Sequence, residues 1–355
     1  MPVIRIKNKT IGTSDTSFII AEAGVNHNGR LDLAKKLIDA ASDAGADAVK
    51  FQTFKADRLV LANTSMAKYQ IANTKQNVSQ YDLIKGLELT QDAFIELKKH
   101  ADSRNIIFLS TPFDEQSADF LESMSIEAFK VSSGEISNHP FLRHVAHKQK
   151  PIILSTGMST IEEVNAAVRV ILETNNHSLA ILHCVSNYPA DPSETNLRAI
   201  ETLQNCFDFP IGFSDHSAGI TISLAARALG ACIIEKHFTL DTGLPGPDHA
   251  MSLTVEQLKE LVTEIRTVEK ALGTGIKAPT QSEEDIKALV RRSITLSTDL
   301  NAGETLNRAM LVALRPGTGI SPVYLESIIG RQVNRPIKKG EILQWGDLNN
   351  EGGAD

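Results

Sequence analysis

Two apolar runs of the sequence end in a polar cluster that contains a histidine. Residues 210–213 are followed by His216, and the run 232–238 contains His237 near its end. Imidazole is a common ligand of Mn²⁺, Fe²⁺, Co²⁺ and Zn²⁺, and two histidines leave most coordination positions open for water and substrate. A polar residue at a strand end is also common where a strand simply passes into a loop. The pair therefore indicates a metal site only if both runs end at the same place in the fold.

Polar side chains that suit anions and sugars accompany the ends of the other apolar runs. Lysines and hydroxyl groups on glycine-flanked turns bind phosphate or carboxylate, and carboxylate and tyrosine side chains suit a molecule rich in hydroxyl groups. Together these residue types indicate a phosphorylated acid, a sugar and a divalent metal as ligands. The residues are Glu22, Lys50, Gln52, Thr111, Lys130, Ser133, Glu135, Ser155, Ser186, Tyr188, Ser214 and Asp248.

The elements that must position these residues are eight short apolar runs, most of them followed by a helix-like stretch. Near-continuous apolar strands indicate a parallel sheet that is buried on both faces. Eight strand–helix units in about 270 residues predict a (β/α)8 TIM barrel, in which the strand ends form one mouth. An open doubly wound sheet is the alternative. The runs cover residues 18–25, 48–54, 106–110, 128–131, 151–154, 179–185, 210–213 and 232–238, with clear helices at 32–45 and 254–273.

The barrel pattern stops near the end of the second clear helix. We expect a catalytic barrel domain over residues 1–275, a linker over 276–290 and a small β-rich domain over 291–355. The last part has short strands separated by turn sequences. The polar segment 55–80, rich in Asn, Gln and Thr, is expected to be an extended loop after the second strand.

The composition excludes several classes of protein. The 355 residues carry a net charge of −7, which argues against non-specific binding to nucleic acid or to an anionic membrane. The sequence contains no apolar run long enough for a transmembrane helix, and its start lacks the apolar segment of a signal peptide. Cys184, Cys206 and Cys232 have no metal-binding spacing, so we expect buried free thiols in a reducing cytoplasm.

Nine motifs in order resemble those of the bacterial sialic acid synthases, the nonulosonic acid synthases that condense phosphoenolpyruvate with an N-acyl sugar. The motifs are IAEAGVNHNG, KFQTFKAD, STPFD, SSGE, LSTGM, LHC-x3-YP, GFSDHS, EKHFTLD and GPDH. The later stretch LRPGTGISP resembles the antifreeze-like (SAF, β-clip) domain of the same family. The resemblance covers nearly the whole chain and implies a TIM barrel followed by a SAF domain.

The resemblance also implies a role for each matching residue. His216 and His237 would hold the metal, with Mn²⁺ expected and Mg²⁺ or Co²⁺ as alternatives. Lys50 and Thr111 would bind the carboxylate of phosphoenolpyruvate, and Lys130, Ser133, Ser155 and Ser214 its phosphate; some family members have Asn in place of Ser186. Glu22, Gln52, Glu135, Tyr188 and Asp248 would contact the sugar, and Lys50, Lys130 and Glu135 would take part in catalysis. Arg315 would reach the N-acyl group from the partner chain of a domain-swapped homodimer.

These features predict a cytoplasmic N-acetylneuraminate synthase that joins phosphoenolpyruvate to N-acetylmannosamine and releases phosphate by C–O cleavage. N,N'-diacetyllegionaminate synthase, acting on 2,4-diacetamido-2,4,6-trideoxy-mannose, is the alternative, and another phosphoenolpyruvate-dependent sugar-acid synthase is a further one. The segment 55–80 is expected to meet the C4 and C6 groups that distinguish the two sugars. Two other functions explain the sequence less well. A Schiff-base aldolase needs no histidine pair, and an ice-binding or carbohydrate-binding protein does not need the polar residues at the strand ends.

Some polar residues near the motifs are expected to be structural. Asp215 alternates with its strand neighbours and therefore points away from the site. Lys236 is expected to pair with Glu235, and His183 lies inside an apolar run. For His27, structural and second-sphere roles are equally consistent with the sequence.

Overall fold

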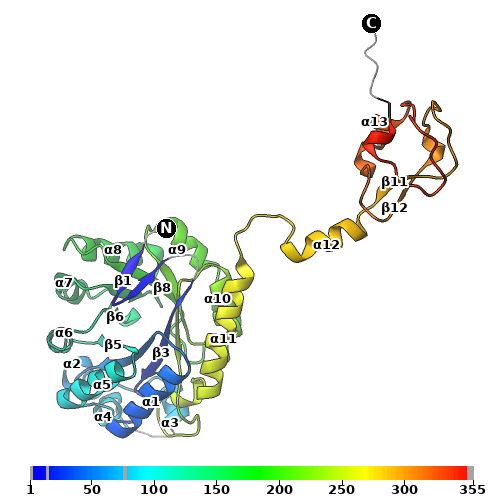
Figure 1. Ribbon diagram of the computed structural model, residues 1–355. Helices are drawn as coiled ribbons and strands as arrows, with labels where there is room; N and C mark the ends of the chain where they lie inside the picture. Colours follow the sequence, from blue (N-terminus) through cyan, green and yellow to red (C-terminus); the bar gives the residue numbers. More distant parts are fainter. Residues whose placement is uncertain (1–2, 13–15, 75–77, 350–355) are drawn as a thin grey trace. The chain divides into compact units, whose positions relative to one another are not determined.

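The computed structural model describes residues 3–12, 16–74 and 78–349 of the chain (Figure 1). Tertiary contacts divide it into two compact units, Met1–Gly273 and Thr274–Asp355. Each unit has a hydrophobic core of its own.

The first unit is a closed barrel of eight parallel strands, and this confirms the (β/α)8 fold over the open sheet. The strands follow each other around the barrel in chain order, and the last pairs with the first. At this closure His237 lies opposite Glu22. The strands are β3 (Phe18–Gly24), β4 (Ala48–Thr53), β5 (Ile107–Pro112), β6 (Phe129–Val131), β7 (Ile152–Ser155), β8 (Leu179–Cys184), β9 (Ile211–Asp215) and β10 (Ile233–His237).

Amphipathic helices surround the barrel and pack their apolar faces on the outward faces of the strands. Hydrogen-bonded caps fix where several of them begin. Thr160 and Glu163 form a capping box at α8, and Thr254 and Gln257 form the box expected at α11. The helices are α1 (Leu31–Asp43), α5 (Gln91–Ser103), α6 (Glu115–Ser123), α7 (His139–His147), α8 (Ile161–Leu172), α9 (Ala199–Cys206), α10 (Thr221–Ala228) and α11 (Val255–Leu272).

A short hairpin covers the N-terminal end of the barrel, which the sequence patterns did not predict. Its strands β1 (Ile4–Ile6) and β2 (Lys9–Ile11) are antiparallel. Their buried isoleucines join one apolar cluster with inward-facing side chains of the barrel strands, including Phe18 and Ile20. Because this end is filled by side chains, ligands must enter from the opposite end, where the strands finish.

The segment 55–80 is not the extended loop expected from its composition. It contains α2 (Ala56–Leu59) and α3 (Lys68–Thr74), and α4 (Gln80–Gly86) follows. Glu88 ties the segment to the barrel side, because its carboxylate accepts the Ala56 amide at 2.8 Å and pairs with Lys55 at 3.1 Å. Helices of four and seven residues are too short to show a periodic apolar pattern.

The second unit is small and largely irregular. The stretch expected as a linker contains α12 (Gln281–Val290), a mostly exposed helix with a capping box between Thr280 and Glu283. The antiparallel strands β11 (Ser293–Leu296) and β12 (Leu311–Leu314) and the short helix α13 (Leu325–Ile328) follow. In the described part of the chain, no helix has the length and apolar character needed to cross a membrane.

Candidate active site

The strand ends bring most of the expected residues to one cavity of about 460 Å³ at the barrel mouth. Side chains alternate along a strand, so residues two apart share the inward face. In β10 this places Glu235 and His237 in the cavity. All of the expected site residues line this cavity except Glu135, Asp248 and Arg315.

The two histidines of the opening motifs lie side by side in this mouth. The ring centroids of His216 and His237 are 5.5 Å apart. His216 Nδ1 lies 2.7 Å from the Val185 carbonyl, which can only accept, so Nδ1 carries a proton and Nε2 is the nitrogen left for a metal. His237 Nδ1 is buried and has no hydrogen-bond partner among the described residues. Burial and the neighbouring His216 hold the pKa of His237 well below its ordinary value, so the ring is neutral, as a metal ligand must be.

The described residues contain no group of three or more His, Cys, Asp or Glu side chains arranged to hold a metal. Within the described residues, the two imidazoles are therefore the expected protein ligands. The donor set fits an ion with several open positions and does not fit a closed structural zinc site. Tyr188 packs against both rings, with its centroid 4.2 Å from that of His216 and 5.9 Å from that of His237.

Four buried charges lie beside the histidines. Lys50 Nζ is 2.8 Å from Glu22 and 3.7 Å from Glu235, and Lys130 Nζ is 3.7 Å from the other oxygen of Glu235. Ser214 donates to Glu235 at 2.8 Å. Burial raises the pKa of Glu22 to about 7 although Lys50 opposes this, and burial lowers the pKa of Lys130. Burial opposes the charge on Glu235 as well, but Lys130 and Lys50 outweigh it and lower the pKa of this carboxyl.

Glu235 is the one member of this charge cluster that the sequence analysis did not select. It was interpreted as the partner of Lys236, and the structure shows that this pairing is wrong. Lys236 faces the surrounding helices and pairs with Asp215 at 2.9 Å. Asp215 also accepts hydrogen bonds from Ser217 and Ser223, which confirms that it points away from the site. The two-residue spacing between Glu235 and His237 was the signal that places Glu235 in the cavity.

Hydroxyl groups next to the lysines complete a site suited to an anion. Lys130 donates to Ser155 at 2.6 Å and Lys50 to Thr111 at 3.1 Å. The Gly157 amide donates to Ser133 Oγ at 2.8 Å. These groups offer several donors around a small volume, and oxyanions are bound by such donors.

The loop after β7 requires a glycine at the edge of this anion site. A Cβ atom on Gly157 would lie 2.3 Å from Ser186 Oγ and 3.0 Å from Ser133 Oγ. The first distance is shorter than real Cβ contacts and the second is tight, so Gly157 allows the loop to approach the two hydroxyl groups closely.

A second chamber of about 300 Å³ adjoins the first and shares Gln52, Tyr188 and His237 with it. Asp248 lines this outer chamber, where burial raises the pKa of its carboxyl to about 6. Part of the remaining wall comes from α2, α3 and α4, so part of the segment 55–80 does face the site.

Two expected residues lie outside both chambers. Glu135 is half-buried at the rim, next to the cavity-lining Gly134, and its carboxylate accepts a hydrogen bond from Asn138 at 2.7 Å. Arg315 belongs to the second unit, where its side chain is exposed just after β12.

Among the three cysteines, only two match the expectation of burial. Cys232 is buried, and Cys184 is buried 3.7 Å from His216 Nδ1. Cys206 is exposed at the end of α9, because this last turn of the helix faces solvent and does not pack on the barrel.

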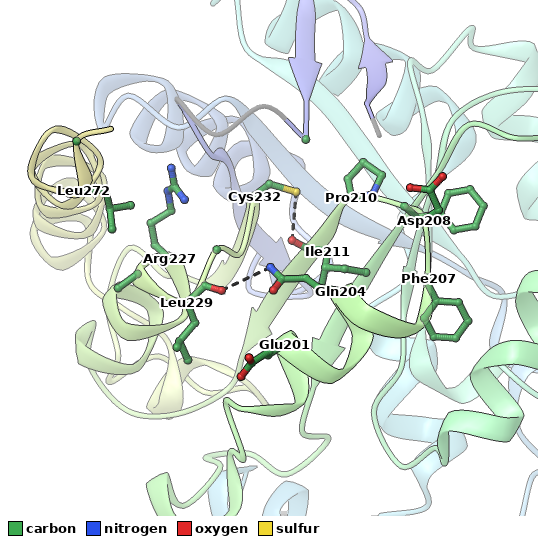
Figure 2. Close-up of a pocket in the computed structure, with 15 residues that line it drawn as sticks. Glu201, Gln204, Phe207, Asp208, Pro210, Ile211, Arg227, Leu229, Cys232 and Leu272 are labelled. Carbon is green, nitrogen blue, oxygen red and sulfur yellow. Dashed lines mark hydrogen bonds between the residues drawn. The ribbon is translucent and has the colours of Figure 1, made fainter. Parts of the chain in front are cut away.

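A larger cavity of about 720 Å³ lies where β9 and β10 begin, at the other end of these strands from the mouth (Figure 2). It contains none of the expected site residues. Arg227 pairs with Glu269 at 3.3 Å, and Cys232 donates to the Ile211 carbonyl at 3.1 Å. These two contacts serve the fold, and most of the residues expected to carry the chemistry line the mouth.

Comparison with known proteins agrees with this geometry. Residues 37–277 match the NeuB family and residues 291–349 match the SAF domain. The chain is 48% identical to the N,N'-diacetyllegionaminic acid synthase of Legionella pneumophila, over 95% of this chain and 96% of that protein. It is 45% identical to the enzyme of the same name from Campylobacter jejuni, over 92% of this chain and 99% of that protein.

A solved structure shows the same fold. The N-acetylneuraminic acid synthetase of Leptospira borgpetersenii has a TM-score of 0.71 and is 38% identical, over 80% of this chain and 94% of that one. The family match covers more than half of the chain and both of its units. The chain is therefore a member of the NeuB family, an enzyme of the nonulosonic acid synthase type with a SAF domain after its barrel.

Proposed function

We propose that this enzyme condenses phosphoenolpyruvate with 2,4-diacetamido-2,4,6-trideoxy-mannose to give N,N'-diacetyllegionaminate and phosphate, in the cytoplasm. The observation that carries the proposal is the single mouth in which a histidine pair adjoins two buried lysines. Identities of 48% and 45% to two diacetyllegionaminic acid synthases, against 38% to an N-acetylneuraminic acid synthetase, support this product over the N-acetylneuraminate first expected.

The inner chamber is proposed to bind phosphoenolpyruvate. Lys50 and Thr111 bind its carboxylate, and Lys130 and Ser155 bind its phosphate together with Ser133, Ser214 and Ser186 at the same wall. The buried ammonium groups hold the negative charges in place before the reaction, so little reorganisation is needed as charge moves. Glu235 balances the two lysines when no anion is bound.

His216 and His237 are proposed to hold a divalent ion, Mn²⁺ in the first place and Mg²⁺ or Co²⁺ otherwise. When bound, such an ion supplies Lewis-acid polarisation of the aldehyde of the open-chain sugar. Burial keeps the ring of His237 neutral, and the Val185 carbonyl orients the ring of His216.

The proposed reaction joins phosphoenolpyruvate and the open-chain sugar in three steps. C3 of phosphoenolpyruvate attacks the aldehyde carbon, water adds at C2, and the tetrahedral carbon expels phosphate with the bridging oxygen. Lys130 and the nearby hydroxyl groups stabilise the departing phosphate. Glu135 is proposed to assist the proton transfers from the rim, where burial raises the pKa of its carboxyl.

Phosphate release with the two sugars side by side tests the function. The diacetamido sugar should give N,N'-diacetyllegionaminate, identified by mass, and a chelator should stop the release. Phosphoenolpyruvate with isotope-labelled bridging oxygen should pass the label to phosphate. Label retained on the organic product, or no release with any N-acyl mannose-type sugar, contradicts the proposal.

We also propose that two chains form a domain-swapped homodimer in which Arg315 of one chain completes the site of the other. The exposure of Arg315 on the smaller unit supports this. An Arg315→Ala chain mixed with a His237→Ala chain tests it, since one hybrid site then regains both residues. Activity of the mixture no higher than that of either variant alone contradicts the swap.

A further inference from the structure

The position of the outer chamber determines which part of the sugar it can contact. The aldehyde carbon C1 must react beside His216 and His237, in the inner chamber. The outer chamber begins at His237 and Tyr188 and extends away from the lysines. The carbons farthest from C1, namely C4 to C6, therefore occupy it. This step rests on the function proposed above.

Gln70 on α3 offers the outer chamber a hydrogen-bond donor that has no partner among the described residues. Its side chain is only 9% exposed and lines the chamber. Its Oε1 accepts the Ala67 amide at 2.9 Å, and only an oxygen can accept there, so the position of Nε2 is fixed. Nε2 donates to none of the residues that the structure describes. The amide therefore has a free N–H group at the chamber, and an acceptor on the ligand can pair with it.

An acceptor faces the same chamber from another element. Asp248 is 8% exposed, and its carboxylate receives no hydrogen bond from the described residues. Asn73 of α3 donates to the Pro247 carbonyl at 2.7 Å, so the helix that carries Gln70 is tied to the loop that carries Asp248. The donor and the acceptor are thus held by one connected structure. An acetamido group has one carbonyl acceptor and one N–H donor, which complements this pair.

Gln80 and Ser132 also line the outer chamber, but one part of its remaining wall is apolar. It is formed by Leu59 and Val60 at the end of α2 and by Leu83, Ile84 and Leu87 of the α4 region. A methyl group gains from burial against such a wall, whereas a buried hydroxyl group without a partner loses its hydrogen bonds to water. A methyl at C6 and the methyl of an acetamido group therefore fit this wall better than a C6 hydroxymethyl group.

We propose that Gln70 is a specificity-determining residue for the sugar. Its Nε2 donates to the carbonyl of the acetamido group at C4, Asp248 accepts from the N–H of the same group, and the wall around Leu83 holds the C6 methyl. The enzyme thus distinguishes the 2,4-diacetamido-6-deoxy sugar from N-acetylmannosamine at C4 and C6, away from the reacting carbon.

The test compares kcat/KM for three sugars at saturating phosphoenolpyruvate, in the full-length protein with metal bound. The sugars are the diacetamido sugar, its analogue with a hydroxyl in place of the C4 acetamido group, and N-acetylmannosamine. Gln70→Glu keeps the acceptor for Ala67 and the length of the side chain but removes the N–H donors, and Gln70→Leu removes both. We expect both variants to lose about 10- to 100-fold with the diacetamido sugar, as for one buried hydrogen bond. They should change less than about 3-fold with the other two sugars, which lack the C4 acetamido group.

Two outcomes separate the failure of this inference from that of the proposed function. If the unaltered enzyme turns over the diacetamido sugar but the variants lose activity equally with all three sugars, Gln70 does not read the C4 group and the inference is overturned. If the unaltered enzyme releases no phosphate with any of them, the proposed function itself fails. Gln116→Leu is the matched control, because this exposed glutamine of α6 lies outside both chambers and should leave all three values unchanged.

Discussion

Replacing Glu235 by glutamine tests whether the charge cluster is built to receive an anion. The substitution keeps the size of the side chain and its contact with Ser214 but removes the negative charge that lies 3.7 Å from both Lys50 and Lys130. Lys50 keeps Glu22 at 2.8 Å, whereas Lys130 loses its carboxylate partner. The free protein should therefore become less stable, mainly through Lys130, and the pKa of Lys130 should fall further.

The size of the loss follows from the burial of the pair. Removing one partner of a buried ion pair costs about 3–5 kcal/mol. Lys130 can shed its proton, since burial already lowers its pKa, and this limits the loss to about 3 kcal/mol. For a unit of this size that corresponds to a fall in Tm of roughly 6–12 °C. Bound phosphoenolpyruvate brings negative charge to the same place, so it should stabilise the Glu235→Gln protein more than the unaltered one.

Calorimetric melting with and without phosphoenolpyruvate is the assay. Asp215→Asn is the matched control, because Asp215 pairs with the buried Lys236 at 2.9 Å on the outer side of the neighbouring strand, away from the cavity. This control should also melt at a lower temperature, but phosphoenolpyruvate should raise its Tm by as much as it raises that of the unaltered protein. The reasoning is refuted if Glu235→Gln melts as the unaltered protein does, or if its gain from phosphoenolpyruvate is no larger than that of Asp215→Asn.

Three further predictions concern the metal, the pH and the anion loop. His237→Ala should abolish the stimulation of phosphate release by added Mn²⁺, and an unchanged metal titration would contradict the histidine site. Burial lowers the pKa of His27 from 6.5 to about 4, so the contribution of its neutral ring to stability is complete above pH 6.5. This contribution, up to about 3 kcal/mol, is lost as the pH falls towards 4. Urea unfolding of His27→Asn should show a smaller loss of stability over this pH range, and an equal loss would exclude His27 as its source. Gly157→Ala places a Cβ atom 2.3 Å from Ser186 Oγ and should raise KM for phosphoenolpyruvate at least about tenfold, whereas Gly134→Ala, with 3.8 Å to its nearest neighbour, should not.

The barrel was predictable because its physical signal is strong and local. Strands that are buried on both faces must be apolar almost throughout, so a polar residue at the end of such a strand is conspicuous. Alternation then assigns each side chain to a face, as it did correctly for Asp215. The same rule applied to Glu235 would have placed it beside His237. The sequence neighbour Lys236 suggested a local pair, but adjacent residues of a strand face opposite ways.

Other features have signals too weak or too distant to predict. The hairpin β1–β2 has three-residue strands, and its burial depends on contacts with strands far along the chain. The helices α2 and α3 are short and polar, and their position over the mouth depends on contacts such as that of Asn73 with Pro247, 174 residues apart. Gln70 was missed for the same reason, because nothing local to it indicates burial in a chamber.

The two chambers are built from different kinds of structure. The residues of the inner chamber lie mostly at the ends of barrel strands, where register fixes them, since a slip by one residue would turn every side chain to the other face. Part of the wall of the outer chamber comes from α2, α3 and α4, which are inserted between β4 and α5 and pair with no strand. Changes in this insertion can alter the volume and polarity around C4 and C6 without moving a lysine or a histidine of the mouth. The sequence motifs therefore identify the chemistry, and the specificity proposed above would place the choice of sugar at the inserted helices.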